Sequence, residues 1–161
     1  MTEIIPDKSY WLLGILEYAS ENTEEGGVKG SLKMEKLNVL VRQKMIKMGH
    51  EEDNWELMMK PFGPTDPGGL SRMLQNYHLL DIAELEKIRD ETIIYKITQK
   101  GKKIKYGLDL FFSKISRNTP SIKEKIEREV LEENITKSGN QLAKTPEIQK
   151  LKHQEIRGKK I

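Results

Sequence analysis

Four polar side chains on one predicted helix carry groups that can read the edges of bases. They are Ser71, Arg72, Gln75 and Asn76. In the major groove of duplex DNA, Arg pairs bidentately with guanine, and Asn or Gln pairs with adenine. The same positions equally fit an ordinary solvated helix face, because the polar side chains of a folded domain must meet water somewhere. The segment therefore predicts either a base-reading surface or a plain polar one.

A cluster of lysines follows further along the chain. Between positions 96 and 105 there are five basic side chains and no acid. They are Lys96, Lys100, Lys102, Lys103 and Lys105. Lysines near the start of a helix oppose its dipole and add no helix stability there. Contact with phosphate is one explanation for the cluster, and a solvated face is the other.

Other kinds of site lack the side chains they need. The 161 residues contain no cysteine, which excludes thiolate zinc sites and cysteine nucleophiles within them. His50 stands beside acidic residues, but no second histidine lies at helical spacing, so no metal site is expected. The Gly26–Ser31 segment lacks the spacing of a phosphate-binding loop. No cofactor is expected, and the chain is not expected to be an enzyme.

Charge is unevenly distributed along the chain. The formal net charge is only +3, too small by itself to indicate nucleic acid. Residues 1–112 carry a net charge of −2 and residues 113–161 one of +5. We predict a folded domain over 1–115 and a basic, partly helical extension over 116–161, mobile beyond about Pro146. No apolar run reaches the ~18 residues of a membrane span, and no secretory signal is visible, so a cytoplasmic protein without membrane contact is expected.

The first half of the chain predicts two helices and an extended segment. Ser9 can cap a helix that runs to about Asn22, followed by a glycine-rich loop over 21–30. Ser31 opens a second helix to about Met48, which Gly49 ends. Its apolar stripe comprises Met34, Leu37, Val41, Met45 and Met48. Residues 55–62 are expected to be a strand or a packed extended segment.

A third helix, a hairpin and a fourth helix are predicted next. Asp66 as N-cap and Pro67 at the first helical position start the third helix. Its inner face is expected to carry Leu70, Met73, Leu74 and Tyr77. Residues 79–85 and 92–97 read as the strands of a hairpin with a polar tip at 87–91, which holds Arg89. Thr98 caps the fourth helix, whose apolar positions are Ile104, Leu108, Phe111, Phe112 and Ile115. Of these, Leu108 and Phe111 are expected to be well buried in the core.

Three helices, a hairpin and a further helix are the order of a winged helix domain, which is an α+β, mostly helical fold. The motif Tyr95-Lys96-Ile97-Thr98-Gln99-Lys100-Gly101 resembles the close of the wing in winged helix-turn-helix regulators of the MarR and PadR kinds. The step Tyr77-His78-Leu79-Leu80 is similar to the turn from their recognition helix into the wing. The step Phe62-Gly63-Pro64 resembles one in Panacea-type antitoxin and related microbial proteins. The resemblance covers about residues 8–115 and implies binding to DNA.

We therefore expect a transcriptional regulator that contacts double-stranded DNA. The expected contacts come from the third helix and the basic residues: Ser71, Arg72, Gln75, Asn76, Arg89, Lys96, Lys100, Lys102 and Lys103. The alternative is a protein-interaction module, such as an antitoxin, adaptor or assembly factor, on the same scaffold. The acidic hairpin favours that alternative, since residues 81–91 carry a net charge of −3.

The extension carries its own aliphatic stripe. Its members are Ile122, Ile126, Val130, Leu131 and Ile135. The stripe fits packing on the same chain and equally fits pairing with a second copy in a homodimer through the C-terminal helices.

Overall fold

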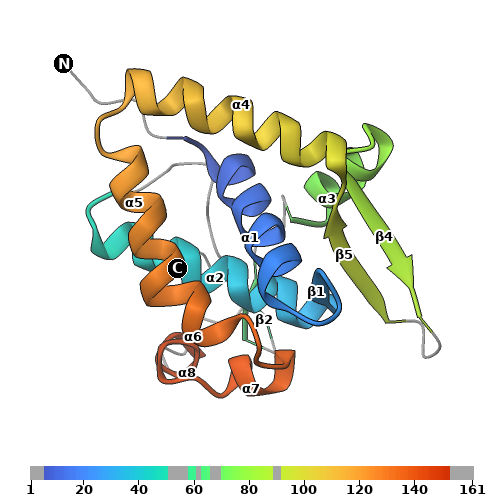
Figure 1. The fold of residues 1–161 in the computed structure, drawn as a ribbon. Helices are drawn as coiled ribbons and strands as arrows, with labels where there is room; N and C mark the ends of the chain where they lie inside the picture. The colour runs from blue at the N-terminus through green and yellow to red at the C-terminus, as the bar shows by residue number, and fades with distance from the viewer. Residues whose placement is uncertain (1–5, 51–57, 61–62, 66–69, 89–91, 153–161) are drawn as a thin grey trace.

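A small antiparallel sheet and a set of helices enclose one buried apolar cluster in the computed structural model, which is an α+β fold dominated by helices (Figure 1). The structure describes residues 6–50, 58–60, 63–65, 70–88 and 92–152. Its helices are α1 (Lys8–Asn22), α2 (Ser31–Lys47), α3 (Leu70–Leu79), α4 (Gln99–Ile115), α5 (Thr119–Ile126), the π-helical turn η1 (Glu127–Leu131), α6 (Glu132–Asn134), α7 (Gly139–Ala143) and α8 (Pro146–Lys152). Its strands are β1 (Val28–Lys29), β2 (Met58–Lys60), β3 (Gly63–Thr65), β4 (Ala83–Lys87) and β5 (Ile93–Ile97). None of the helices in this described part is both long and apolar enough to cross a bilayer.

The central helix, α1, is apolar around most of its circumference because other elements surround it (Figure 1). It contacts α2, α4, η1 and strand β5, which explains why a single amphipathic face is absent. Asp7, rather than Ser9, caps the helix, since its carboxylate accepts the backbone N–H of Ser9 at 3.0 Å. The predicted cap is therefore wrong by two residues, although the helix ends at Asn22 as expected.

The predicted loop over 21–30 contains a strand. Strand β1 pairs antiparallel with β5, setting Val28 opposite Tyr95, so the sheet has the order β1-β5-β4. A Cβ at Gly27 would lie 2.4 Å from the carbonyl oxygen of Tyr95. Only glycine allows the two backbones to approach this closely. The prediction of a plain loop is wrong because a two-residue strand has no periodicity of its own.

Helix α2 and its apolar stripe agree with the prediction. Met34, Leu37, Val41 and Met45 are buried, and Gly49 follows the helix with φ of +83°. Within the predicted extended segment, residues 58–60 form β2, which pairs with β3 in a separate short hairpin. The proposed start of the third helix at Asp66 and Pro67 lies outside the described residues.

The chain turns between α3 and β4 later than predicted. Helix α3 runs through Leu79, and the strand begins only at Ala83. The N–H of Ile82 donates to the carbonyl of Tyr77 at 2.7 Å, which closes the turn. Leu79 and Leu80 are consequently 81% and 57% exposed. The prediction of a strand from residue 79 is wrong, because the apolar alternation there belongs to a helix end and a turn.

Helix α4 starts as predicted, and Ile104, Leu108 and Phe112 pack against the core, but its fully buried residues are not among the predicted apolar positions. The Thr98 hydroxyl accepts the N–H of Gly101 at 2.9 Å. The buried residues of the helix are Gly101 and Lys105, and a Cβ on Gly101 would meet the carbonyl oxygen of Ile82 at 2.2 Å. Because the inner face is centred on these two positions, Phe111 lies at its margin and is 54% exposed. The expectation that Phe111 belongs to the core is wrong.

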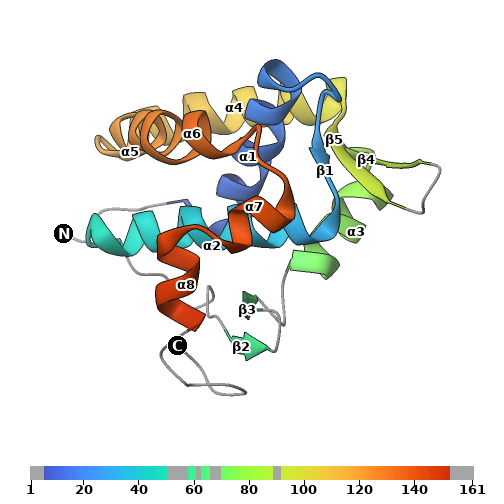
Figure 2. The same ribbon diagram turned by 90° about the horizontal axis from the view of Figure 1, so that it is seen from below.

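The segment after α4 packs against the rest of the chain. Residues 119–134 are continuously helical, and the aliphatic stripe from Ile122 to Ile135 is buried in the same cluster as α1 and α2. Helices α7 and α8 lie against α2 (Figure 2). The stripe thus packs on its own chain, which is the first of the two alternatives predicted for it. The expectation of mobility beyond Pro146 is wrong for α8, where Ile148 and Leu151 are buried, and residues 153–161 lie outside the described part.

Candidate nucleic-acid interface

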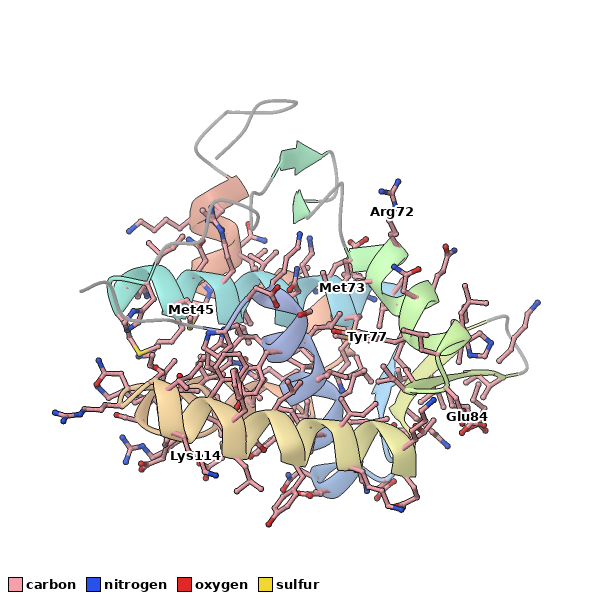
Figure 3. All side chains as sticks on the ribbon, turned by 90° about the horizontal axis from the view of Figure 1, so that it is seen from above. Met45, Arg72, Met73, Tyr77, Glu84 and Lys114 are labelled. Atoms are coloured by element: carbon pink, nitrogen blue, oxygen red, sulfur yellow. The ribbon has the colours of Figure 1, made fainter. Side chains whose placement is uncertain are left out.

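Helix α3 is amphipathic, with one face held against the core and the other in solvent. Leu74 and Tyr77 are buried, and the Tyr77 hydroxyl donates to the backbone carbonyl of Ser9 at 2.7 Å. Burial, the largest influence, raises the pKa of Tyr77, so the hydroxyl stays a donor. Met73 and Tyr77 point inward in Figure 3, while Arg72 projects away from the body.

Three of the four candidate base-reading side chains lie on the outer face of α3. Arg72, Gln75 and Asn76 are exposed; the side chain of Ser71 lies outside the described part. The sequence placed the inner and outer faces of this helix correctly, because its apolar residues recur at helical spacing.

The lysines of α4 are divided between the surface and the interior. Lys100 is exposed, and its ammonium donates to the carbonyl oxygen of Leu80, just past the end of α3, at 2.9 Å. Lys103 is exposed and Lys102 is half-buried. These three are the lysines of α4 within the cluster that solvent, and hence phosphate, can reach without rearrangement of the helix.

Lys105 lies inside the molecule, so the expectation that it belongs to a surface cluster is wrong. Its side chain is fully buried, 2.8 Å from the Asp109 carboxylate and 3.5 Å from that of Glu17. The ammonium also lies 4.5 Å from the centre of the Tyr10 ring. Two carboxylates and an aromatic face compensate a cation that burial would otherwise make costly.

Asp109 is the centre of this buried ionic network. It accepts the Tyr10 hydroxyl and lies 3.4 Å from the ammonium of Lys123. Burial works to raise the pKa of Asp109, but hydrogen bonds from Lys105 and Tyr10 and the nearby ammonium charges outweigh it, so the pKa lies below its usual value. The network joins α1, α4 and α5.

The hairpin β4–β5 carries little free positive charge in its described part. Lys96 on β5 forms an ion pair with Glu86 on β4, and a hydrogen bond to that carboxylate raises the pKa of Lys96. Glu84 is exposed on the same strand (Figure 3). Arg89 lies outside the described residues. Strands β4 and β5 together carry two glutamates and two lysines, so the negative charge expected over 81–91 does not lie on the strands themselves.

The candidate contacts do not gather into one patch. In Figure 3, Arg72 projects from one side of the body while α4 runs along the other. Lys100 is the link between them, since its side chain reaches the backbone just beyond the end of α3. The arrangement offers an exposed polar face on α3, with the exposed lysines on a different helix, α4.

Sequence analysis did not predict the ionic network. It also did not predict the groove beside the network, between α4 and α5, which is lined by Asp109 and Lys123 among others. The signal for the network was the spacing of Lys105 and Asp109, four residues apart on one helix. Among the described residues, no group of three or more His, Asp or Glu side chains is placed to hold a metal ion.

Comparisons with known proteins return no relationship. No family model, no curated protein and no solved structure matches this chain.

Proposed function

We propose that this chain is a winged helix protein that binds duplex DNA as a transcriptional regulator. The order α1-β1-α2-β2-β3-α3-β4-β5-α4 contains the winged helix order with the β2–β3 pair added between α2 and α3, and together with a sheet in the order β1-β5-β4 it supports this assignment. In the proposal α3 is the recognition helix and the β4–β5 hairpin is the wing. The observation that carries the proposal is the outward face of α3, where Arg72, Gln75 and Asn76 are exposed on a helix that Tyr77 fixes to α1.

Each group has its own role in this proposal. Arg72 would pair with guanine, and Gln75 and Asn76 with adenine, in the major groove. Lys100, Lys102 and Lys103 would contact phosphate and so contribute affinity without sequence information. Lys96 stays paired with Glu86, and the acidic hairpin keeps the wing from lying deep in a groove.

A protein-interaction module on the same scaffold is the second candidate. The observation that favours it is a set of large apolar side chains that the described residues expose to solvent. Four of them lie on α4, and Leu79 and Leu80 lie at the end of α3. The α4 set is Tyr106, Leu110, Phe111 and Ile115. Where exposed apolar side chains are contiguous, they commonly mark a contact with another protein.

Electrophoretic retardation of random and selected duplex DNA across a salt series tests the first candidate. Arg72→Ala is expected to weaken specific binding by about 1–3 kcal/mol and to relax preference at one base pair. Arg128→Ala is the matched control, since Arg128 is also exposed but lies on η1. Replacing Lys102 and Lys103 with Ala should weaken binding to all sequences alike and lower the salt slope by about one for each phosphate interaction that the substitutions remove.

Absence of duplex binding at low salt would refute the DNA proposal, because electrostatic attraction is strongest there. Equal losses in the Arg72→Ala and Arg128→Ala proteins would remove the role assigned to α3. In either case the interaction module becomes the leading candidate.

A further inference from the structure

A groove of about 380 Å³ opens between α4 and α5, with the start of α1 as its floor. This volume falls in the range of small-ligand sites. Its apolar lining comes from Tyr10, Leu110 and Pro120. Leu110 is 46% exposed, so the apolar wall continues onto the surface of α4. The groove thus offers an apolar contact to a ligand that reaches it from solvent.

The ionisable lining of the groove is mostly acidic. Asp109, Glu124 and Glu127 line it together with a single cation, Lys123. Asp109 is satisfied, since it lies 2.8 Å from Lys105 and 3.4 Å from Lys123. The excess negative charge of the groove therefore belongs to the two glutamates.

Glu127 has weaker compensation of its negative charge than Asp109 has, because its ion-pair partner is farther away. Lys123 lies 3.9 Å away, beyond hydrogen-bond distance, and the Glu127 side chain is only 37% exposed. Burial raises the pKa of Glu127; the charges of Glu17 and Glu21 add to this, against Lys123 and Lys105. Glu124, in contrast, is well solvated and lies 3.5 Å from Arg128.

A backbone irregularity begins at the same residue. Glu127 is the first residue of η1, a π-helical turn inserted between α5 and α6. Single π turns within helices are rare and occur often at functional sites. The turn changes the direction in which successive side chains leave the helix. It begins at Glu127, one of the acidic residues that line the groove.

We propose that this groove binds a small organic cation, a protonated amine on a short apolar body, with the ammonium at the Glu127 carboxylate and the body against Leu110 and Pro120. The cation would add a closer positive charge to Glu127, from which Lys123 lies 3.9 Å away. The apolar body would cover the exposed part of Leu110. This site is separate from the outer face of α3, so the inference does not depend on DNA binding.

Three probes of similar shape and different charge test the inference on the full chain. Benzylammonium, benzyl alcohol and benzoate are titrated into ¹⁵N-labelled protein, and the backbone amide signals are followed by NMR. Benzylammonium is expected to shift the signals of Ser113, Thr119 and Glu127 with an affinity at least ten times that for benzyl alcohol. Benzoate is expected to leave those signals unchanged. Equal responses to the three probes, or shifts confined to other regions, would overturn the proposal.

Two matched variants test the role of Glu127. Glu127→Gln keeps the size of the side chain and removes its charge, so the preference for benzylammonium over benzyl alcohol is expected to fall at least tenfold. Glu133→Gln is the control, because Glu133 is 72% exposed on α6 and does not line the groove. An unchanged preference in the Glu127→Gln protein, or an equal loss in both variants, would contradict the assignment of the ammonium to Glu127.

The pH dependence of benzylammonium binding tests the role of Glu127 independently of the variants. The groups that face Glu127 are Glu17 and Glu21 from α1, Lys105 from α4 and Lys123 from α5. Glu127 attracts the ammonium when it is ionised and not when it is protonated. Affinity for benzylammonium should therefore fall as the pH drops through the pKa of this carboxyl group. Affinity for benzyl alcohol should stay constant over the same range, and a parallel fall of both would refute the assignment.

Discussion

Replacing Asp109 by Asn tests whether the buried network holds α1, α4 and α5 together. The change keeps the shape of the side chain but removes the charge that faces the fully buried ammonium of Lys105 at 2.8 Å. Loss of one partner from a buried ion pair costs about 3–5 kcal/mol. Asp109 is 24% exposed and Glu17 remains 3.5 Å from Lys105, so we expect a smaller cost of about 2–3 kcal/mol.

The assay is urea unfolding followed by circular dichroism at pH 7, together with thermal unfolding. Each kcal/mol corresponds to roughly 2–4 °C in the midpoint for a domain of this size, so a fall of about 5–10 °C is expected. Asp81→Asn is the matched control, because Asp81 is exposed and has φ of +59°, a conformation that Asn adopts readily. Its free energy of unfolding should change by less than about 0.5 kcal/mol.

The pH dependence has a definite sign. Because the pKa of Asp109 is lowered in the folded state, its charge stabilises the fold above the pKa of an unfolded Asp, about 3.9. This stabilisation is lost as the pH falls through the lower, folded-state value. The difference between wild type and the Asp109→Asn protein should therefore be full at pH 7 and shrink below about pH 4.

A double variant separates charge from packing. Replacing Lys105 with Met and Asp109 with Asn together removes both charges, and stability is expected to return to within about 1 kcal/mol of wild type, because no buried cation is left without its counter-charge. A change below about 0.5 kcal/mol in the single Asp109→Asn protein, which is the range of ordinary surface substitutions, would refute the reasoning. So would a double variant that is less stable than the single one.

Four further substitutions test the packing, each by urea unfolding. Leu37→Ala should cost about 2–5 kcal/mol, because Leu37 is fully buried, whereas Phe111→Ala should cost less than about 1 kcal/mol, since Phe111 is 54% exposed. Gly101→Ala should destabilise by more than about 2 kcal/mol, because its Cβ would meet the carbonyl oxygen of Ile82 at 2.2 Å; a neutral result would contradict the close approach of α4 to the turn before β4. Leu142→Ala should cost about 2–5 kcal/mol and raise hydrogen exchange in α8, because α7 and α8 pack on α2; unchanged exchange would show that α8 docks independently of α7.

Local patterns in the sequence were enough to find most of the elements. The apolar stripe of α2, the two faces of α3, the Thr98 cap and the β5 strand follow from spacing and capping chemistry that act within a few residues. The same patterns placed Arg72, Gln75 and Asn76 in solvent. These features could be predicted because each depends on neighbours close in the chain.

Tertiary structure decided the features that depend on distant neighbours. Lys105 is buried because Glu17, 88 residues earlier, and the ring of Tyr10 meet it there. Within α4, Asp109 four residues later is the local feature that distinguishes it from exposed Lys103. Strand β1 exists only because β5 offers it a partner. The net charge of the last part of the chain predicted a mobile arm, yet Ile148 and Leu151 are buried. The spacing of the aliphatic residues in a short helix such as α8 predicts an apolar face. Only the arrangement of α2 and its neighbours determines where that face packs.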